Sequence, residues 1–196
     1  MSSDVEICNM ALAGLGVSQG ISALSEAGTA AEQCNLFFVT CRKRVLRDFD
    51  WPFARRYYTL GLVAEDPNTD WTYSYRYPAT CLSIRSVVGA NRKDTSRIPY
   101  SLGSDASGKL IYTDEPEAVV RMTVDITDTE LFDPVFVSAF AGLLGSKIGG
   151  PLARDPKLVT QSYQFYLADI ASARADAQNE GGQDEAPDAE SIRARS

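Results

Sequence analysis

The sequence predicts an α+β protein: a four-helix bundle with a β-rich insertion between its second and third helices, and an extended C-terminal tail. Two observations predict this. Apolar residues recur at spacings of three and four before residue 50 and after residue 133. Between them, residues 55–126 hold short Tyr-, Thr-, Val- and Ile-rich segments separated by Gly, Pro and Asn turns. We therefore expect residues 1–54 and 127–178 to form the bundle, 55–126 the insertion and 179–196 the tail.

Two helices are expected in the first fifty residues. The first covers residues 3–14, because Ser3 and Glu6 have the spacing of a capping box and Gly14 and Gly16 follow. The second covers about residues 30–49, with Thr29 and Glu32 as a second capping box. Its predicted buried stripe consists of Cys34, Phe37, Phe38, Cys41, Val45 and Phe49. Pro52 prevents this helix from continuing.

Six strands are expected next, near residues 55–63, 71–77, 81–88, 97–102, 109–113 and 118–126. The last has the clearest alternation, because Val120, Met122 and Val124 share one face while Arg121 and Thr123 share the other. The segments "PNTDW" and "VGANRKDTS" are expected to be turns or loops between strands.

Helical spacing returns at Asp133, which has the place of an N-cap before Pro134. Residues 149–151, Gly-Gly-Pro, are expected to end this third helix. The small residues of "GLLGSK" at 142–147 are interpreted as permitting close helix packing, since the phosphate-loop spacing is absent. Asp155 and Pro156 start a fourth helix, whose seam is expected to be Val159, Tyr163, Tyr166, Ile170 and Ala173.

The composition narrows the classes of function. The chain has 196 residues, a formal net charge of −7 and no histidine. Without histidine, the commonest general base and metal ligand are missing, and we expect neither an enzyme nor a bound cofactor or metal. No signal peptide or membrane-spanning run is expected. Cys8, Cys34, Cys41 and Cys81 lack CxxC spacing and are interpreted as small buried apolar residues.

Two other motifs have a structural explanation that is simpler than a functional one. The segment "GLGVSQG" at 14–20 is glycine-rich, but a helix rather than a strand precedes it, which argues against a dinucleotide loop. Asp125, Asp128, Glu130 and Asp133 do not have the spacing of a calcium loop. We interpret these carboxylates as caps at the junction between a strand and a helix.

The stretch "RVLRDFDWPFARRYYTLGL" at 44–62 combines aromatic and basic residues. Such a combination is typical of surfaces that stack and hold nucleic acid. Aromatic residues between a helix end and a strand also commonly fill the gap between two layers of structure. We favour packing or subunit contact here. The nucleic-acid alternative stays open, with Arg42, Lys43, Arg44, Arg55 and Arg56 as its basic face.

Several segments together resemble one protein family. They are "ICNMALAGLGV", "AAEQCNLFFVTCRKRVLRDFDWPFARR", "YSYRYPATCLSI" and "LFDPVFVSAFAGLLGSKI". The matching positions are Asn9, Ala11, Leu12, Leu15, Gly16, Ala31, Cys34, Asn35, Trp51, Phe53 and Ala54. In this order the segments resemble the head-to-tail adaptor proteins of short-tailed bacteriophages, the tail tubular protein A-like family. Thr80 stands where this family frequently has an acidic residue.

The resemblance implies a structural virion protein that is assembled in the host cytoplasm. Twelve copies would form a ring in the neck of the virion, between the portal protein and the tail nozzle protein. DNA would pass through the ring without specific binding, as the acidic net charge favours. The tail, whose one large apolar residue is Ile192, would dock on the portal. The expected portal-binding residues are Glu190, Ser191, Ile192, Arg193 and Arg195, and the expected subunit or tail contacts are Arg55, Arg56, Tyr57, Arg92 and Lys93.

A third class, a virion enzyme that cleaves peptidoglycan, would require a paired acid and nucleophile. The sequence offers no convincing pair. The three hypotheses therefore make different demands on the fold: complementary faces for an adaptor, a basic face for nucleic-acid binding, and a cleft with an acid and a nucleophile for an enzyme.

Overall fold

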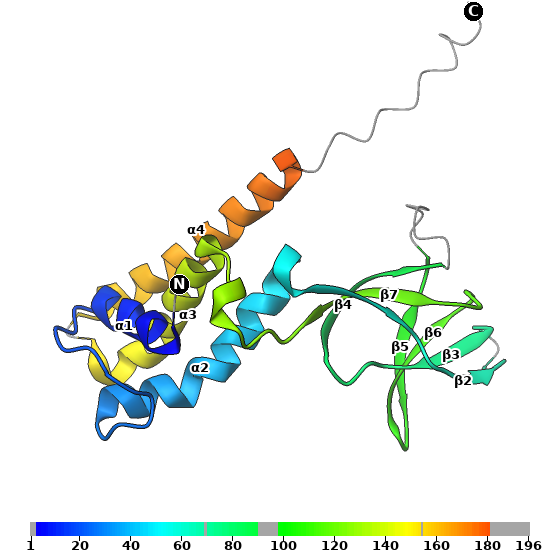
Figure 1. The fold of residues 1–196 in the computed structure, drawn as a ribbon, viewed down its shortest axis with the longest axis horizontal. Coiled ribbons are helices and arrows are strands. Elements are labelled where there is room, and N and C mark those ends of the chain that lie inside the picture. The colour runs from blue at the N-terminus through cyan, green and yellow to red at the C-terminus, as the bar shows by residue number, and fades with distance from the viewer. Residues whose placement is uncertain (1–2, 69, 90–97, 154, 181–196) are drawn as a thin grey trace, which may run out of the picture.

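A computed structural model describes residues 3–68, 70–89, 98–153 and 155–180 of the chain. A helical region and a β region lie side by side, and the chain passes between them at the ends of two helices (Figure 1). The helices are α1 (Asp4–Gly14), α2 (Thr29–Asp48), α3 (Pro134–Leu152) and α4 (Pro156–Glu180). Two short 3₁₀ turns, η1 (Pro52–Ala54) and η2 (Thr129–Leu131), lie at the passage between the regions.

The predicted four-helix bundle with a β insertion between helices 2 and 3 is wrong. The protein is a mixed α and β structure with four helices and two antiparallel sheets. Helix α3 is a central helix that packs against α1, α2 and α4, whereas those three contact one another much less. Ten of the 19 residues of α3 are buried, so it lacks the polar face of a bundle helix. Periodicity identified the apolar positions of each helix, but it cannot say which helices pack together.

Glycines allow α3 and α4 to approach closely. A Cβ atom on Gly142 would lie 3.0 Å from the carbonyl oxygen of Ser162 and 3.1 Å from the backbone nitrogen of Tyr166. A Cβ atom on Gly145 would lie 3.2 Å from Ser162 Oγ. The interpretation of "GLLGSK" as a close-packing segment is therefore confirmed. The predicted seam of α4 is correct for Tyr166, Ile170 and Ala173, which are buried, but Tyr163 is 43% exposed.

The helix ends agree only partly with the sequence signals. Ser3 and Glu6 form the predicted capping box of α1, and Asp133 accepts a hydrogen bond from the Val135 amide at the start of α3. The capping box predicted at Thr29 is wrong, because Gly28 is the N-cap of α2 and no side chain caps it. Helix α3 continues through Gly149, Gly150 and Pro151 to Leu152, so its predicted stop is also wrong.

In the described part of the chain after α2, seven strands form two sheets. The three-stranded sheet has the order β1 (Arg55–Thr59), β7 (Val119–Val124), β4 (Cys81–Val88). The four-stranded sheet has the order β2 (Leu62–Glu65), β3 (Tyr73–Arg76), β6 (Gly108–Thr113), β5 (Ser101–Asp105). The single strand predicted at 55–63 is in fact two strands, β1 and β2, that belong to different sheets. Every pairing between neighbouring strands is antiparallel.

The described residues form two hydrophobic cores. The larger one joins all four helices to the aromatic residues after α2, and the smaller one lies between the sheets around Tyr75, Ile111 and Val120. Strand β7 was predicted to alternate, yet both Met122 and Thr123 are buried. Thr123 is buried because its side of the sheet faces the end of α2, where its hydroxyl accepts a hydrogen bond from Arg85.

Helix α3 also has the length and the mean hydropathy (1.4) of a membrane span, so the expectation that no such run exists is wrong. Of that stretch, 56% is buried inside the protein. A core helix passes the same test, and α3 therefore carries no information about a membrane.

Candidate functional site: the arginine junction

The segment after α2 turns the chain from the helices into the first sheet. Helix α2 ends at Asp48, Phe49 is extended, and η1 leads directly into β1. Trp51 is only 2% exposed, and its indole N–H donates a hydrogen bond of 2.9 Å to the carbonyl of Val45. This bond ties the connecting segment back to the last turns of α2, so the position of the sheet depends on the position of this helix.

Five aromatic rings surround this turn: Phe49, Trp51, Phe53, Phe132 and Phe136. Trp51 makes edge contacts with Phe49 and Phe136, with ring centroids 4.9 and 5.2 Å apart. Phe53 and Phe132 both contact Phe136, at 5.2 and 4.7 Å. The rings fill the space between η1, η2 and the start of α3. The prediction that these aromatics pack in the gap between two layers is confirmed, and Trp51 and Phe53 are not placed for base stacking.

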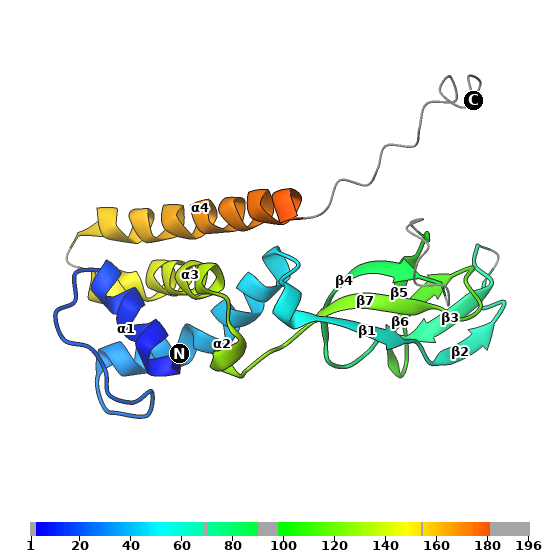
Figure 2. The ribbon, with the colours of Figure 1, turned by 45° about the horizontal axis from the view of Figure 1, so that its top comes forward.

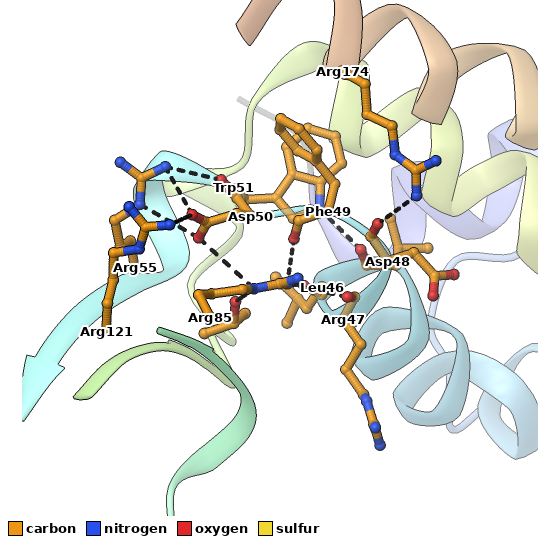
Figure 3. A network of polar contacts seen from close by, with 12 residues as sticks. Leu46, Arg47, Asp48, Phe49, Asp50, Trp51, Arg55, Arg85, Arg121 and Arg174 are labelled. Atoms are coloured by element: carbon orange, nitrogen blue, oxygen red, sulfur yellow. Dashed lines mark hydrogen bonds and ion pairs between the residues drawn. The ribbon is translucent and has the colours of Figure 1, made fainter. Parts of the chain in front are cut away.

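Arg85 of β4 binds the C-terminal end of α2 (Figure 3). One of its terminal nitrogens donates to the carbonyls of Leu46, Arg47 and Phe49, at 3.0, 3.1 and 2.6 Å. Its Nε donates to Thr123 Oγ1 at 2.7 Å. The last carbonyls of a helix have no partner within the helix and carry partial negative charge, so a guanidinium there supplies both hydrogen bonds and charge. Desolvation by burial lowers the pKa of Arg85.

Asp50 lies among three guanidinium groups. It pairs with Arg55 at 3.1 Å, with Arg121 at 3.6 Å and with Arg85 at 3.8 Å. We call Asp50, Arg55, Arg85 and Arg121 the arginine junction (Figure 3). Its members come from the segment after α2 and from strands β1, β4 and β7, so it joins the first sheet to the helices. One carboxylate faces three cations here, and Nε of Arg121 is buried without a hydrogen-bond partner.

A cavity of about 340 Å³ opens beside the arginine junction. It lies between the segment after α2, the start of α3 and the end of α4, and it is lined by Phe49, Asp50, Trp51, Pro52, Arg55, Asp133, Val135, Ala173, Asp176 and Ala177. Among its described lining residues the charged groups are mainly acidic, because Arg55 is the one cation there and is already paired with Asp50. This arrangement favours a structural role, the rigid connection of the two regions, over a binding site for an anion.

The basic residues of the nucleic-acid alternative are mostly paired with carboxylates. Arg42 is 8% exposed and makes two hydrogen bonds to Asp125, at 3.0 and 3.1 Å. Three more pairs follow: Lys43 with Asp125, Arg44 with Asp48, and Arg55 with Asp50. Arg56 instead donates to the carbonyls of Phe53 and Arg55. The structure thus brings these five cations to one end of α2 and places an acidic residue beside four of them.

The predicted contact residues are separated by the fold. Arg55 belongs to the arginine junction, whereas Arg56 and Tyr57 lie on the exposed part of β1, where Tyr57 is 49% exposed. Two further contact residues, Arg92 and Lys93, lie outside the described residues. So do the five residues predicted to bind the portal: Glu190, Ser191, Ile192, Arg193 and Arg195.

Arg85 and Arg121 were missed by sequence reasoning. Each sits in a strand of ordinary composition, and only the pairing of β4 with β7 and the contact of both with α2 bring them to Asp50. The one signal for them in the sequence was the presence of an arginine within an apolar strand. A buried arginine requires partners for its charge, so such a residue indicates a polar site.

The cysteines have the character of core residues. Cys8, Cys34 and Cys41 are buried, as predicted, whereas Cys81 is half-buried. Burial raises the pKa of Cys41 to about 11, and a hydrogen bond to Cys34 raises the pKa of Cys8. Both thiols stay protonated near neutral pH. The same hydrogen bond lowers the pKa of Cys34, which is fully buried in the helical core.

No protein-family model matches this chain, and no curated protein matches its sequence.

Proposed function

We propose that the protein is a structural virion protein: a head-to-tail adaptor whose copies form a ring between a portal and a tail nozzle. The observation that carries the proposal is the number of large apolar side chains exposed on several separate surfaces. Among the described residues they are Met10, Leu36, Val39, Tyr57, Tyr58, Leu62, Val63, Leu102, Leu131, Tyr163, Phe165 and Leu167, each between 43% and 65% exposed. Clusters of such residues mark protein–protein contact surfaces.

The strand edges support the proposal from the β region. Strand β1 is at the edge of one sheet, and β2 and β5 are the two edges of the other. Nearly all residues of these strands are exposed, and Tyr57, Tyr58, Leu62 and Val63 follow one another along two of them. An exposed edge strand with apolar side chains readily pairs with another chain. In an adaptor, these edges would face the tail or a neighbouring copy.

The arginine junction supports the proposal by joining the two regions. Arg85 spans from β4 to three carbonyls at the end of α2, and Trp51 fixes the connecting segment to the same helix. A subunit that transmits contact from a portal at one end to a tail at the other requires such a rigid link. In this proposal, residues 190–195 of the C-terminal segment dock on the portal. This part of the proposal rests on the sequence alone.

Electron microscopy of the full-length protein tests the proposal, both alone and mixed with the portal protein of the same genome. We expect closed rings stacked coaxially on the portal. A chain ending at Glu180 should fold with an unchanged melting temperature and fail to join the portal, because it keeps all the described residues of α4 and of both hydrophobic cores. A subunit that stays solitary in both conditions would refute the adaptor proposal.

A salt titration with duplex DNA tests the alternative. Tight binding at about 150 mM salt that collapses at higher salt would indicate phosphate contacts and favour the nucleic-acid module. We expect weak binding, because carboxylates already pair with Arg42, Arg44 and Arg55.

A further inference from the structure

A groove with apolar rims runs between α1, α3 and α4. Met10 and Phe165, 47% and 57% exposed, line it, and the small residues Gly14 and Gly142 contribute to its surface. Its volume is about 200 Å³. Two large apolar side chains beside small residues form a shape into which side chains of another helix can insert.

An acidic side chain without a partner also lines this groove. Asp169 of α4 is half-buried, and its Oδ2 atom is buried with no hydrogen-bond partner. No lysine or arginine is among the groove-lining residues of the described chain. A buried carboxylate oxygen with no partner costs free energy, which a cation brought by another molecule would offset.

Helix α2 exposes a stripe of complementary character. Leu36, Val39 and Lys43 follow one another at helical spacing on its outer face, and Leu36 is 65% exposed. The Lys43 side chain is 46% exposed, and its ammonium group lies 3.7 Å from Asp125. Because Arg42 already holds Asp125 with two hydrogen bonds, Lys43 can leave this carboxylate without stranding it. The stripe therefore presents two apolar side chains and one available cation.

We propose that the Leu36–Val39–Lys43 stripe of one copy docks into the α1–α3–α4 groove of the next copy, with Lys43 pairing with Asp169. Val39 and Lys43 are four residues apart, as are Phe165 and Asp169. In each pair the two residues lie on one face of the helix, and the apolar residue is the one nearer the N-terminus. The charged residues of the two pairs, Lys43 and Asp169, have opposite signs. Two parallel helices thus bring Val39 onto Phe165 and Lys43 onto Asp169 in the same register.

The arrangement of the helices fits a ring. Helices α2 and α4 run in the same general direction, from the left end of the molecule towards the β region, and α3 lies between them (Figures 1 and 2). Copies placed side by side in one orientation therefore present α2 parallel to the neighbour's α4. The contact joins two different faces, which is the condition for a closed ring. This inference rests on the proposed adaptor function, for which it names the contact between neighbouring copies.

Charge exchange tests the contact. The variants are Asp169→Lys, Lys43→Glu and the double variant that carries both substitutions. Self-association of the full-length protein is followed by sedimentation velocity over a concentration series, alone and with the portal protein. We expect each single variant to weaken self-association about tenfold or more, and the double variant to recover most of the loss. Far-UV circular dichroism establishes that each variant is folded.

Glu130→Lys is the matched control. Glu130 is exposed in η2 and lines neither the groove nor the cavity beside the arginine junction, so the substitution makes the same change of charge away from both. We expect it to leave self-association unchanged. Recovery by the double variant separates a direct contact from a loss of folding, because a misfolded single variant would not be rescued by a substitution on the outer face of α2.

The outcomes separate this contact from the adaptor proposal. If the wild-type protein forms rings and Asp169→Lys forms them equally well, the contact is wrong while the adaptor proposal stands. If the effect of Asp169→Lys disappears in a chain ending at Glu180, residues 181–196 rather than α2 occupy the groove, and the contact is again wrong. If the wild-type protein forms no ring with or without the portal, both proposals fail.

Discussion

Replacing Trp51 with alanine removes the largest fully buried side chain in the described part of the protein. The change leaves a cavity at the point where the chain leaves α2 and enters the first sheet. Trp51 contacts Phe49 and Phe136 through ring edges, and its indole N–H satisfies the carbonyl of Val45. We therefore expect Trp51→Ala to destabilise the helical core and to loosen its connection to the β region.

The size of the loss follows from burial and hydrogen bonding. A tryptophan buries about 150–250 Å², which at about 25 cal/mol per Å² corresponds to about 4–6 kcal/mol. An extended unfolded chain overstates this burial by about 10–40%. The lost hydrogen bond adds about 1 kcal/mol. Substitutions of this kind typically cost about 3–5 kcal/mol, and we expect about 4 kcal/mol here.

Urea unfolding followed by far-UV circular dichroism measures this loss of unfolding free energy. Trp71→Ala is the matched control, because Trp71 is the only other tryptophan and is half-exposed near a turn. It should cost about 1 kcal/mol or less. Trp51→Phe keeps an aromatic ring and removes the bond to Val45, so it should cost about 1–2 kcal/mol. A Trp51→Ala value no larger than that of Trp71→Ala would refute the packing argument.

Three further predictions concern contacts between elements. Arg85→Met should lower the unfolding free energy in urea by about 2–3 kcal/mol, because three carbonyls at the end of α2 lose a charged donor; a neutral result would contradict this role. Gly142→Ala should lower the unfolding free energy by about 1–3 kcal/mol, because the added methyl group pushes α3 away from α4. Gly150→Ala is its control: a Cβ atom there meets nothing within 4 Å, so the melting temperature should not change. Burial and a hydrogen bond to Asp48 raise the pKa of Tyr166 to about 12 from an ordinary 10.0. The contribution of neutral Tyr166 to the unfolding free energy is therefore fully present below pH 10 and is lost as pH rises to about 12. In Tyr166→Phe, the fall in melting temperature over this pH range should be smaller.

Local sequence signals identified most elements of this fold. Helix α1, strand β4 and the start of α3 agree with the predicted segments to within a residue or two, because caps, turn residues and periodicity act over short distances. The break at Leu60 and Gly61, which sends β1 and β2 into different sheets, left no distinct signal. It depends on which strands each segment pairs with, and pairing is decided between residues far apart in the chain.

The candidate site divides in the same way. The sequence by itself favoured packing or subunit contact for the aromatic residues after α2, since a helix end followed by a strand leaves a gap that large rings fill. The structure confirmed the packing and placed Trp51 in the core. Only the tertiary structure placed Arg85 and Arg121 beside Asp50, made α3 a central helix, and brought Met10 and Asp169 into one groove. Periodicity reports which face of an element is apolar, whereas the partner of that face is chosen by packing across the whole chain.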